Sequence, residues 1–259
     1  EMETLDMDDA LGFYDIYYSP NNAILVVSGD VTPEEVRALA EEHYSKIPAN
    51  PDLPERLRTQ EPPQTAERRL VYRDARVAQP YVRRSYLAPE RDSGAQETAA
   101  ALVFLSEILG GGTTSFLTEE LQFNQEVALF SGSFYRPVSL DDTTFNIIVA
   151  PRPNVTLQEA EDAMDAALAK FMETGVDPEQ LERIKFQIRA DQIFARDDVD
   201  RIANRYGQAL TSGLTVEDVQ AWPEVLQAVT EEDIMAAARG IFDKRASVTG
   251  WLMREEVTQ

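Results

Sequence analysis

The chain contains no cysteine among its 259 residues, which excludes disulfide bonds, thiolate metal sites and cysteine nucleophiles. Histidine is almost as scarce, because His43 is its single copy. A catalytic zinc needs about three protein ligands and an open position for water, so this sequence supplies too few nitrogen and sulfur donors for one. His43 lies near the end of an expected helix, where a histidine interacts favourably with the helix dipole. We therefore expect a structural role for it.

Basic residues are also few: 24 Lys and Arg stand against 46 Asp and Glu, a net charge of −22. Such a surface repels phosphate backbones, so no nucleic-acid partner is expected; it favours basic partners or simply promotes solubility. The longest apolar runs, Ala23–Val27 and Ala99–Leu105, are too short to cross a bilayer, so no membrane span is expected. A chain without cysteine suits a reducing compartment but also fits the periplasm, so the localisation stays open.

Sequence fingerprints of catalysis are missing as well. There is no nucleophile elbow, Walker A loop, dinucleotide fingerprint or EF-hand spacing. The triplet Gly110, Gly111 and Gly112 follows an expected helix and lacks the Lys-Ser/Thr ending of a phosphate loop, which predicts a flexible helix-to-helix turn. Glu119 and Glu120 are adjacent on an expected helix and do not share a face, so they make a poor acid/base pair. No catalytic or metal-binding residue is expected in this chain.

The first 47 residues predict a helix, a strand and a second helix. Leu5–Tyr18 starts with aspartates, which stabilise the positive end of a helix dipole. Ala23–Val27 is a continuous run of β-favouring apolar residues, typical of a strand buried on both faces. Thr32, followed by Pro33 and Glu35, predicts a capped helix that continues to about residue 46.

Residues 48–67 hold five prolines among charged and polar residues, which predicts a stiff linker. Beyond it, β-favouring segments predict strands at Arg69–Asp74, Tyr81–Leu87, Val127–Tyr135, Thr143–Ala150 and Ser247–Leu252. Helical patterns occupy Ser93–Leu109, Thr114–Gln122, a segment opened by the capping box Thr156/Glu159, and a segment from Pro178 to about Phe194. Helices and strands are mixed without regular βαβ alternation, which predicts an α+β fold.

Several segments of the sequence are similar to segments found in one protein family. The stretch Tyr17–Asn22, followed by an apolar strand, a Gly-Asp turn and a capped helix, resembles the late part of the first domain in the insulinase/pitrilysin zinc metallopeptidases. This inverzincin group includes mitochondrial processing peptidase. Leu109–Leu121 resembles the family's glycine-rich turn and following helix, while Phe171–Pro178 and Ala228–Ile234 resemble its later helices. The resemblance covers nearly the whole chain.

The resemblance implies a two-layer α/β sandwich in which a mixed sheet is packed by helices, and a parent protein whose domains close around a peptidase chamber. The family's zinc is held by an inverted His-x-x-Glu-His helix and a distant glutamate, both upstream of the part matched here. Residues 1–47 would then be the C-terminal remnant of a catalytic-type domain, and 68–259 a complete non-catalytic second domain after the linker at 48–67. Zinc is implied for the parent and no cofactor for this chain.

The family's second domain often supplies an arginine and a tyrosine, seven residues apart, that help to hold the substrate. The matching positions here are Gln122 and Leu129, and Phe116 replaces another common arginine. Glutamine carries no positive charge and leucine forms no side-chain hydrogen bond, so neither performs the same role. The resemblance therefore implies a heterodimer, in which a homologous subunit brings the arginine and the tyrosine.

We therefore expect the chain to be the non-catalytic portion of a bacterial-type zinc metalloendopeptidase. It would wall the chamber and offer a surface to the partner subunit and to unfolded peptides, which a sheet edge can capture by strand addition. The parent would hydrolyse peptides with a zinc-activated water. The alternatives are a non-catalytic scaffold of the same fold, like the core subunits of respiratory complexes, and an unrelated α+β interaction domain. A His-x-x-Glu-His helix encoded upstream of residue 1 would favour the peptidase over the scaffold.

The scarcity of metal ligands generates a first prediction. We expect the isolated chain to bind no stoichiometric zinc and to cleave no peptide, because His43 is its only histidine and cysteine is absent. Metal analysis after dialysis and a fluorogenic-peptide assay measure both properties. One tightly held zinc per chain that is lost on His43→Ala would contradict this prediction.

Overall fold

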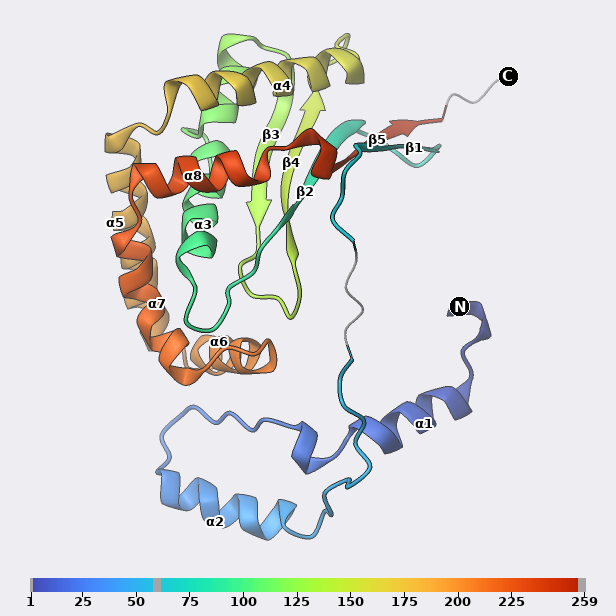
Figure 1. Ribbon diagram of the computed structural model, residues 1–259, viewed down its shortest axis with the longest axis vertical. Helices are drawn as coiled ribbons and strands as arrows, with labels where there is room; N and C mark the ends of the chain where they lie inside the picture. Colours follow the sequence, from blue (N-terminus) through green and yellow to red (C-terminus); the bar gives the residue numbers. More distant parts are fainter. Residues whose placement is uncertain (1, 58–61, 256–259) are drawn as a thin grey trace. The chain divides into compact units, whose positions relative to one another are not determined.

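The computed structural model describes residues 2–57 and 62–255. The chain divides into two compact units, one comprising Glu1–Glu61 with Phe194–Thr211 and the other Pro62–Ile193 with Ser212–Gln259. The larger unit contains the sheet and most of the helices (Figure 1). Whether the boundary between domains lies in the proline-rich segment stays a prediction. None of the described helices combines the length and the apolar character that crossing a membrane requires.

A five-stranded mixed sheet forms the centre of the larger unit, with the strand order β1-β5-β2-β4-β3. Its strands are β1 (Arg68–Asp74), β2 (Tyr81–Ala88), β3 (Ala128–Tyr135), β4 (Thr143–Pro151) and β5 (Ser247–Arg254). Strands β1 and β5 are parallel, and the other neighbours are antiparallel. The five strands expected beyond the linker are confirmed to within a few residues. The mixed sheet and its helices confirm the α+β class.

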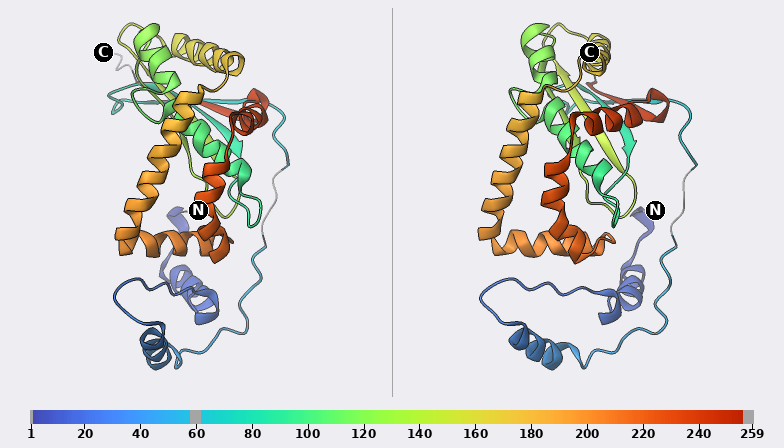
Figure 2. Two further views of the ribbon diagram at one scale, coloured as in Figure 1. Left: turned by 90° about the vertical axis from the view of Figure 1, so that its left-hand side faces the viewer. Right: turned by 60° about the vertical axis from the view of Figure 1, so that its left-hand side comes forward.

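Helices cover one face of this sheet (Figures 1 and 2). The helices of the larger unit are α3 (Glu97–Gly110), α4 (Leu157–Thr174), α5 (Pro178–Phe194), α7 (Val216–Ala228) and α8 (Glu231–Ile241). Of these, α3, α4 and α8 contact the strands. Alternate residues of β2 and β4 point into this layer, and Val82, Phe145, Ile147 and Val149 are fully buried there. The period of two along each strand therefore separates a helix-covered face from an opposite face, called here the open face.

Capping boxes fix where several helices begin. The hydroxyl of Thr156 accepts a hydrogen bond from the backbone N–H of Glu159, and the Glu159 carboxylate accepts one from the backbone N–H of Thr156. This confirms the predicted start of α4. Met164 and Phe171 lie on the expected apolar stripe of that helix and are buried in the core. Local capping and helical periodicity together determine how α4 covers the sheet.

The smaller unit contains α1 (Met7–Tyr17), α2 (Pro33–Tyr44) and α6 (Val199–Thr211). The predicted capping by Thr32 and Glu35 is confirmed, but no residue of α1 or α2 is buried. The prediction of a strand at Ala23–Val27 is wrong, because these residues pair with no strand in the described part of the chain. A strand needs a neighbour to satisfy its backbone N–H and C=O groups, and the described residues of this unit offer none. Ile24 and Leu25 are consequently about half exposed, at 50% and 56%.

Candidate functional site

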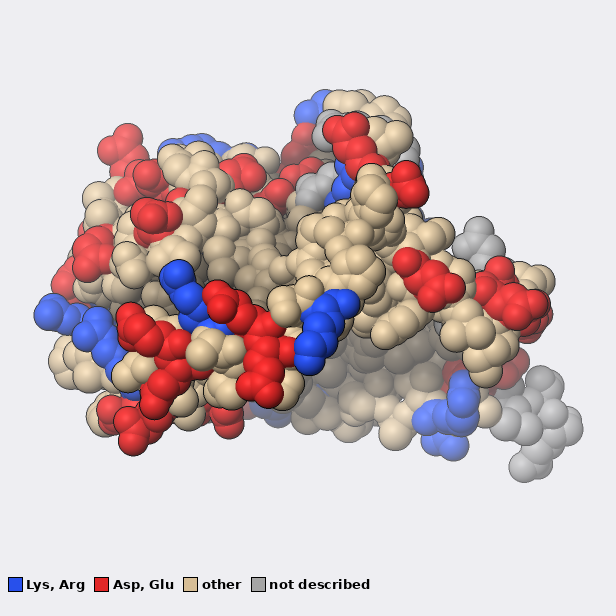
Figure 3. Space-filling view, turned by 90° about the horizontal axis from the view of Figure 1, so that it is seen from below, with Lys and Arg blue, Asp and Glu red and all other residues tan. Residues whose placement is uncertain are grey.

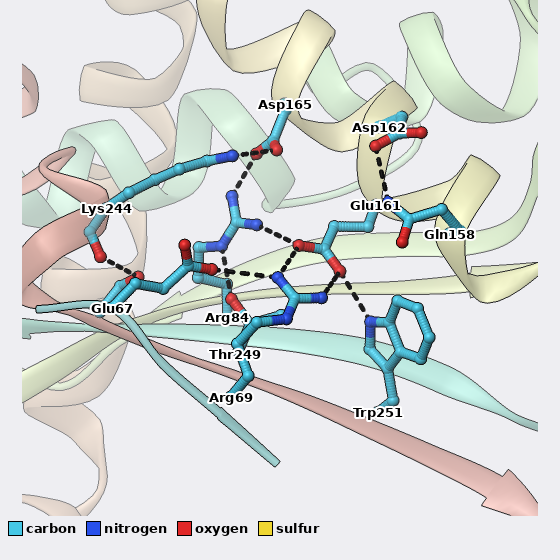
Figure 4. A network of polar contacts seen from close by, with 11 residues as sticks. Glu67, Arg69, Arg84, Gln158, Glu161, Asp162, Asp165, Lys244, Thr249 and Trp251 are labelled. Carbon is cyan, nitrogen blue, oxygen red and sulfur yellow. Dashed lines mark hydrogen bonds and ion pairs between the residues drawn. The ribbon is translucent and has the colours of Figure 1, made fainter. Parts of the chain in front are cut away.

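One cluster of ionisable side chains lies between α4 and the helix-covered face of the sheet (Figure 4). Its centre is the Glu161 carboxylate on α4, which is only 3% exposed. Arg69 on β1 donates one hydrogen bond to each carboxylate oxygen, both at 2.7 Å. Arg84 on β2 donates to Oε1 at 2.8 Å, and the indole of Trp251 on β5 donates to Oε2 at 2.7 Å. The carboxylate thus accepts four hydrogen bonds, which fills its lone-pair positions.

The remaining donors of this cluster are also satisfied. Arg84 is fully buried, and it contacts Thr249 through Nε at 2.9 Å and Asp165 through Nη1. Lys244 pairs with the same aspartate. Burial opposes ionisation of Glu161, but the hydrogen bonds from Arg69 and Trp251 outweigh it and hold the pKa of this carboxyl below its usual value. Because four hydrogen bonds within the protein occupy the lone-pair positions of the Glu161 carboxylate, none is left for a metal ion, and we interpret this network as structural.

A second group of residues lies where the chain passes from α3 into β3, and it contains the sequence-predicted positions. The expected short helix forms, but its residues Thr118–Asn124 are a π-helical turn, a rare geometry that is frequent at functional sites. Glu126 then adopts a left-handed φ of 54°, and the register of β3 shifts between Ala128 and Phe130. We call this turn, the register shift and the end of β4 at Arg152 the sheet corner.

The glycine triplet at 110–112 positions the sheet corner relative to α3. A Cβ atom on Gly110 would lie 1.9 Å from the backbone nitrogen of Ser133, so α3 approaches β3 this closely only with glycine there. A Cβ atom on Gly111 would lie 2.2 Å from the Glu107 side chain, and Gly112 has a φ of +154°. The triplet therefore ends α3 and brings the next turn against the sheet, and it carries no chemical group of its own.

Arg152, which the sequence analysis did not single out, links the segments that contain Gln122 and Leu129. The amide of Gln122 donates to Ser131 at 2.9 Å and to Thr118 at 3.3 Å, so it is engaged within the corner. Leu129 is 51% exposed within the register shift. Arg152, at the end of β4, donates through Nη2 to the carbonyl of Gln122 at 2.9 Å and through Nε to that of Ala128 at 3.4 Å.

The open face of the sheet carries several exposed apolar side chains. Its exposed apolar side chains are between 47% and 56% accessible and come from three strands: Leu70, Tyr72, Leu87, Phe130 and Phe134. The phenyl rings of β3 flank Gly132, where an added Cβ would meet them at 3.3 and 3.4 Å. At the centre of this face, Asn146 Oδ1 accepts hydrogen bonds from Arg83 at 2.8 Å and from Ser85 at 2.7 Å.

Acidic residues outnumber basic ones in this chain, and acidic side chains are widespread on the face seen in Figure 3. Several surface cations are neutralised by a carboxylate close in sequence. Arg76 pairs with Asp74 and Arg245 with Asp243, both at 2.6 Å. The contacts of Arg152 are different, because its two close partners are neutral carbonyls. The sheet corner thus keeps a positive charge within an acidic protein.

Comparison with known proteins matches the chain to one protein family and to longer relatives. A family model described as the peptidase M16 inactive domain matches residues 4–188. The chain is 24% identical to the zinc protease PqqE of Helicobacter pylori, over 97% of this chain and 56% of that protein. It is 24% identical to the mitochondrial-processing peptidase subunit beta of Lentinula edodes, over 91% of this chain and 52% of that protein. The chain therefore spans about half the length of the curated relatives it matches.

The same fold is found in a solved structure. A crystal structure of a protease from Helicobacter pylori superposes with a TM-score of 0.88 at 24% identity, covering 97% of this chain and 60% of that one. Among the described residues, no group of three or more His, Cys, Asp or Glu side chains is arranged to hold a metal ion.

The buried network generates a stability prediction. We expect Glu161→Gln to lower the free energy of unfolding at neutral pH by about 3 kcal/mol, because it removes the carboxylate that Arg69 and the buried Arg84 share and leaves Arg84 paired with Asp165 alone among the described residues. The effect should shrink in acid. The folded-state pKa of Glu161 is lowered, so its contribution is complete above the unfolded pKa of about 4.3 and is lost as the pH falls through the folded value. Denaturant unfolding of both proteins between neutral pH and acid measures this.

The matched control is Glu173→Gln, an exposed carboxylate near the end of the same helix. We expect it to change the free energy of unfolding by no more than about 0.5 kcal/mol. Equal effects of the two substitutions, or a Glu161→Gln effect that does not depend on pH, would show that the network does not hold the fold together.

Proposed function

This chain belongs to the family of peptidase M16 inactive domains, and we propose that its open face walls the chamber of a zinc metalloendopeptidase and binds unfolded peptide there. The single observation that carries this proposal is the exposed apolar surface of the sheet, built from Leu70, Tyr72, Leu87, Phe130 and Phe134. Apolar patches of this kind on a folded domain mark interaction surfaces. An unfolded peptide offers both the apolar side chains and the extended backbone that such a surface can hold.

Two further features support a peptide as the occupant. Strand β3 ends the sheet on one side, so its outer edge can pair with an extended segment by strand addition. Arg83 lies on the open face between apolar side chains, and its guanidinium can donate to peptide carbonyls while its bond to Asn146 holds it in place. Backbone pairing is tolerant of sequence, and the apolar face adds affinity.

We propose that the catalytic zinc binds to the rest of the parent protein and not to this chain. The residues present do not fit a catalytic zinc, because one histidine and no cysteine leave the donor set incomplete. We propose that residues 1–47 complete a catalytic-type domain with upstream residues of the parent. Ile24 and Leu25, half exposed on an unpaired extended segment, are the side chains that such a domain would cover.

The partner of the parent is proposed to be a homologous subunit. Gln122 and Leu129 lack the charge and the hydroxyl of the family's arginine–tyrosine pair, so a second protein of the same fold would contribute these groups. The alternative is a non-catalytic scaffold of the same fold. Binding of a free peptide to the open face would favour the peptide-binding role over the scaffold role. Peptide binding is therefore the decisive measurement.

We predict that a short, unstructured, fluorescein-labelled peptide rich in apolar residues binds to the chain, and that Phe134→Ser weakens binding about tenfold, the effect of losing one partly buried aromatic contact. Fluorescence anisotropy measures the affinity. Phe186→Ser removes a phenyl group that is 74% exposed on α5, outside the sheet, and serves as the control. If no peptide binds, or if both substitutions act equally, the open face is not a peptide surface.

The division of labour is tested with the complete parent protein. We expect it to cleave peptides efficiently only when it is co-expressed with a homologue that carries the arginine and the tyrosine, since this chain lacks both at the family's positions. Peptidase activity of each protein alone and of the mixture is the measurement. Full activity of the parent alone, unchanged by the homologue, would refute the heterodimer.

A further inference from the structure

We propose that Arg152 at the sheet corner binds a carboxylate of the peptide held on the open face. This inference rests on the proposed peptide-binding function and goes further, because it names the group of the ligand that is recognised and the residue that recognises it. The ligand chemistry is a peptide carboxylate flanked by apolar side chains, either the C-terminal carboxylate or an acidic side chain.

The position of Arg152 is fixed by backbone contacts. It lies between Pro151 and Pro153, whose rings restrict the backbone on both sides. Its own N–H donates to the carbonyl of Val127 at 2.9 Å. Its guanidinium bridges the π-helical turn and the register shift through the carbonyls of Gln122 and Ala128. A cation held this way loses little freedom when a ligand binds.

The hydrogen bonds of Arg152 leave part of its guanidinium available. A guanidinium has five N–H donors, and the two carbonyl bonds use one on Nε and one on Nη2. The two donors on Nη1 and the second on Nη2 make no hydrogen bond to the described part of the chain. These donors lie side by side at the end of the fork, the arrangement that binds both oxygens of a carboxylate. The side chain is 39% exposed, so a ligand can reach it.

The charge of Arg152 is poorly compensated within the chain. The carboxylate paired with it belongs to Glu126, whose Oε1 lies 4.0 Å from Nη2 and whose side chain is 67% exposed. An ion pair this long and this accessible to water contributes little. An incoming carboxylate that makes two direct hydrogen bonds can therefore displace Glu126 from the guanidinium.

Exposed apolar residues follow, in the sequence, the two residues whose carbonyls Arg152 binds, which favours a peptide over a free small anion. Arg152 binds the carbonyls of Gln122 and Ala128, and the residues that directly follow are Phe123, 62% exposed, and Leu129, 51% exposed. With a net charge of −22, the chain repels small anions in general, so charge alone gives weak binding. The proposed ligand is therefore a carboxylate beside an apolar side chain, which Phe123 or Leu129 would contact while the guanidinium binds the carboxylate.

The resemblance places an arginine at position 122, where this chain has glutamine. Arg152 brings a guanidinium to the carbonyl of that residue from a different strand. The sheet corner thereby keeps a cation although position 122 carries none.

The test compares two forms of one unstructured, fluorescein-labelled peptide that ends in leucine, one with a free C-terminal carboxylate and one with a C-terminal amide. We expect the wild-type chain to bind the acid about tenfold more tightly than the amide, as one hydrogen-bonded charge pair gives. Arg152→Gln should abolish this preference and leave the affinity for the amide unchanged. A third peptide, amidated but with glutamate before the leucine, distinguishes an acidic side chain from the C-terminal carboxylate as the bound group.

Arg183→Gln is the matched control, because it removes an exposed arginine on α5 and should leave the preference intact. Arg152→Lys keeps the charge without the fork and should retain part of the preference, which separates loss of recognition from loss of folding. If the wild-type chain binds carboxylate and amide peptides equally while Phe134→Ser still weakens both, the role of Arg152 is refuted and the open face stands. If no peptide binds at all, the proposed function fails as well.

Discussion

The fold of the larger unit depends on one buried carboxylate, Glu161 of α4, which ties three strands to a helix. Arg69, Arg84 and Trp251 reach it from β1, β2 and β5. Strand β1 needs this connection most, because none of its residues is buried and apolar contact alone cannot hold it on the sheet. A buried ion pair contributes little net energy compared with apolar packing, but removing one partner leaves a charge without compensation. The network therefore fixes which strands lie under α4.

The Glu161 network lies on the helix-covered face of the sheet, and the exposed side chains of the open face take no part in it. On the helix-covered face, the carboxylate of Glu161 is fully engaged by four hydrogen bonds. The open face keeps exposed aromatic rings such as Phe134 and a surface guanidinium, Arg83. The period of two along a strand separates these roles within single strands: in β2, Arg84 belongs to the network and Arg83 to the open face.

The sequence predicts what local chemistry determines. Alternation and capping identify the five strands and the start of α4 at Thr156, since each signal lies within a few residues. The strand expected at Ala23–Val27 was wrong because a strand also requires a partner that a local pattern cannot supply. The burial of Arg84 was not predictable either, because Glu161 lies 77 residues away in the sequence. The resemblance directed attention to Gln122 and Leu129, whereas Arg152 was missed because it binds backbone carbonyls, which leave no trace in the side-chain pattern.

The sheet corner contains the guanidinium of Arg152, although Gln122 and Leu129 occupy the positions where the family often has an arginine and a tyrosine. Arg152, which directly follows β4, reaches the carbonyl of Gln122 in the π-helical turn, and what matters for binding a carboxylate is where the guanidinium ends and not where its Cα lies. A hydroxyl is harder to replace, since Leu129 is the exposed residue in the register shift and no polar atom of its side chain can donate. Arg152 thus gives the sheet corner a positive charge, although neither Gln122 nor Leu129 carries the groups of the family's pair. In the proposed heterodimer, the homologous partner would bring the arginine–tyrosine pair that positions the substrate, and Arg152 would bind a carboxylate of the captured peptide.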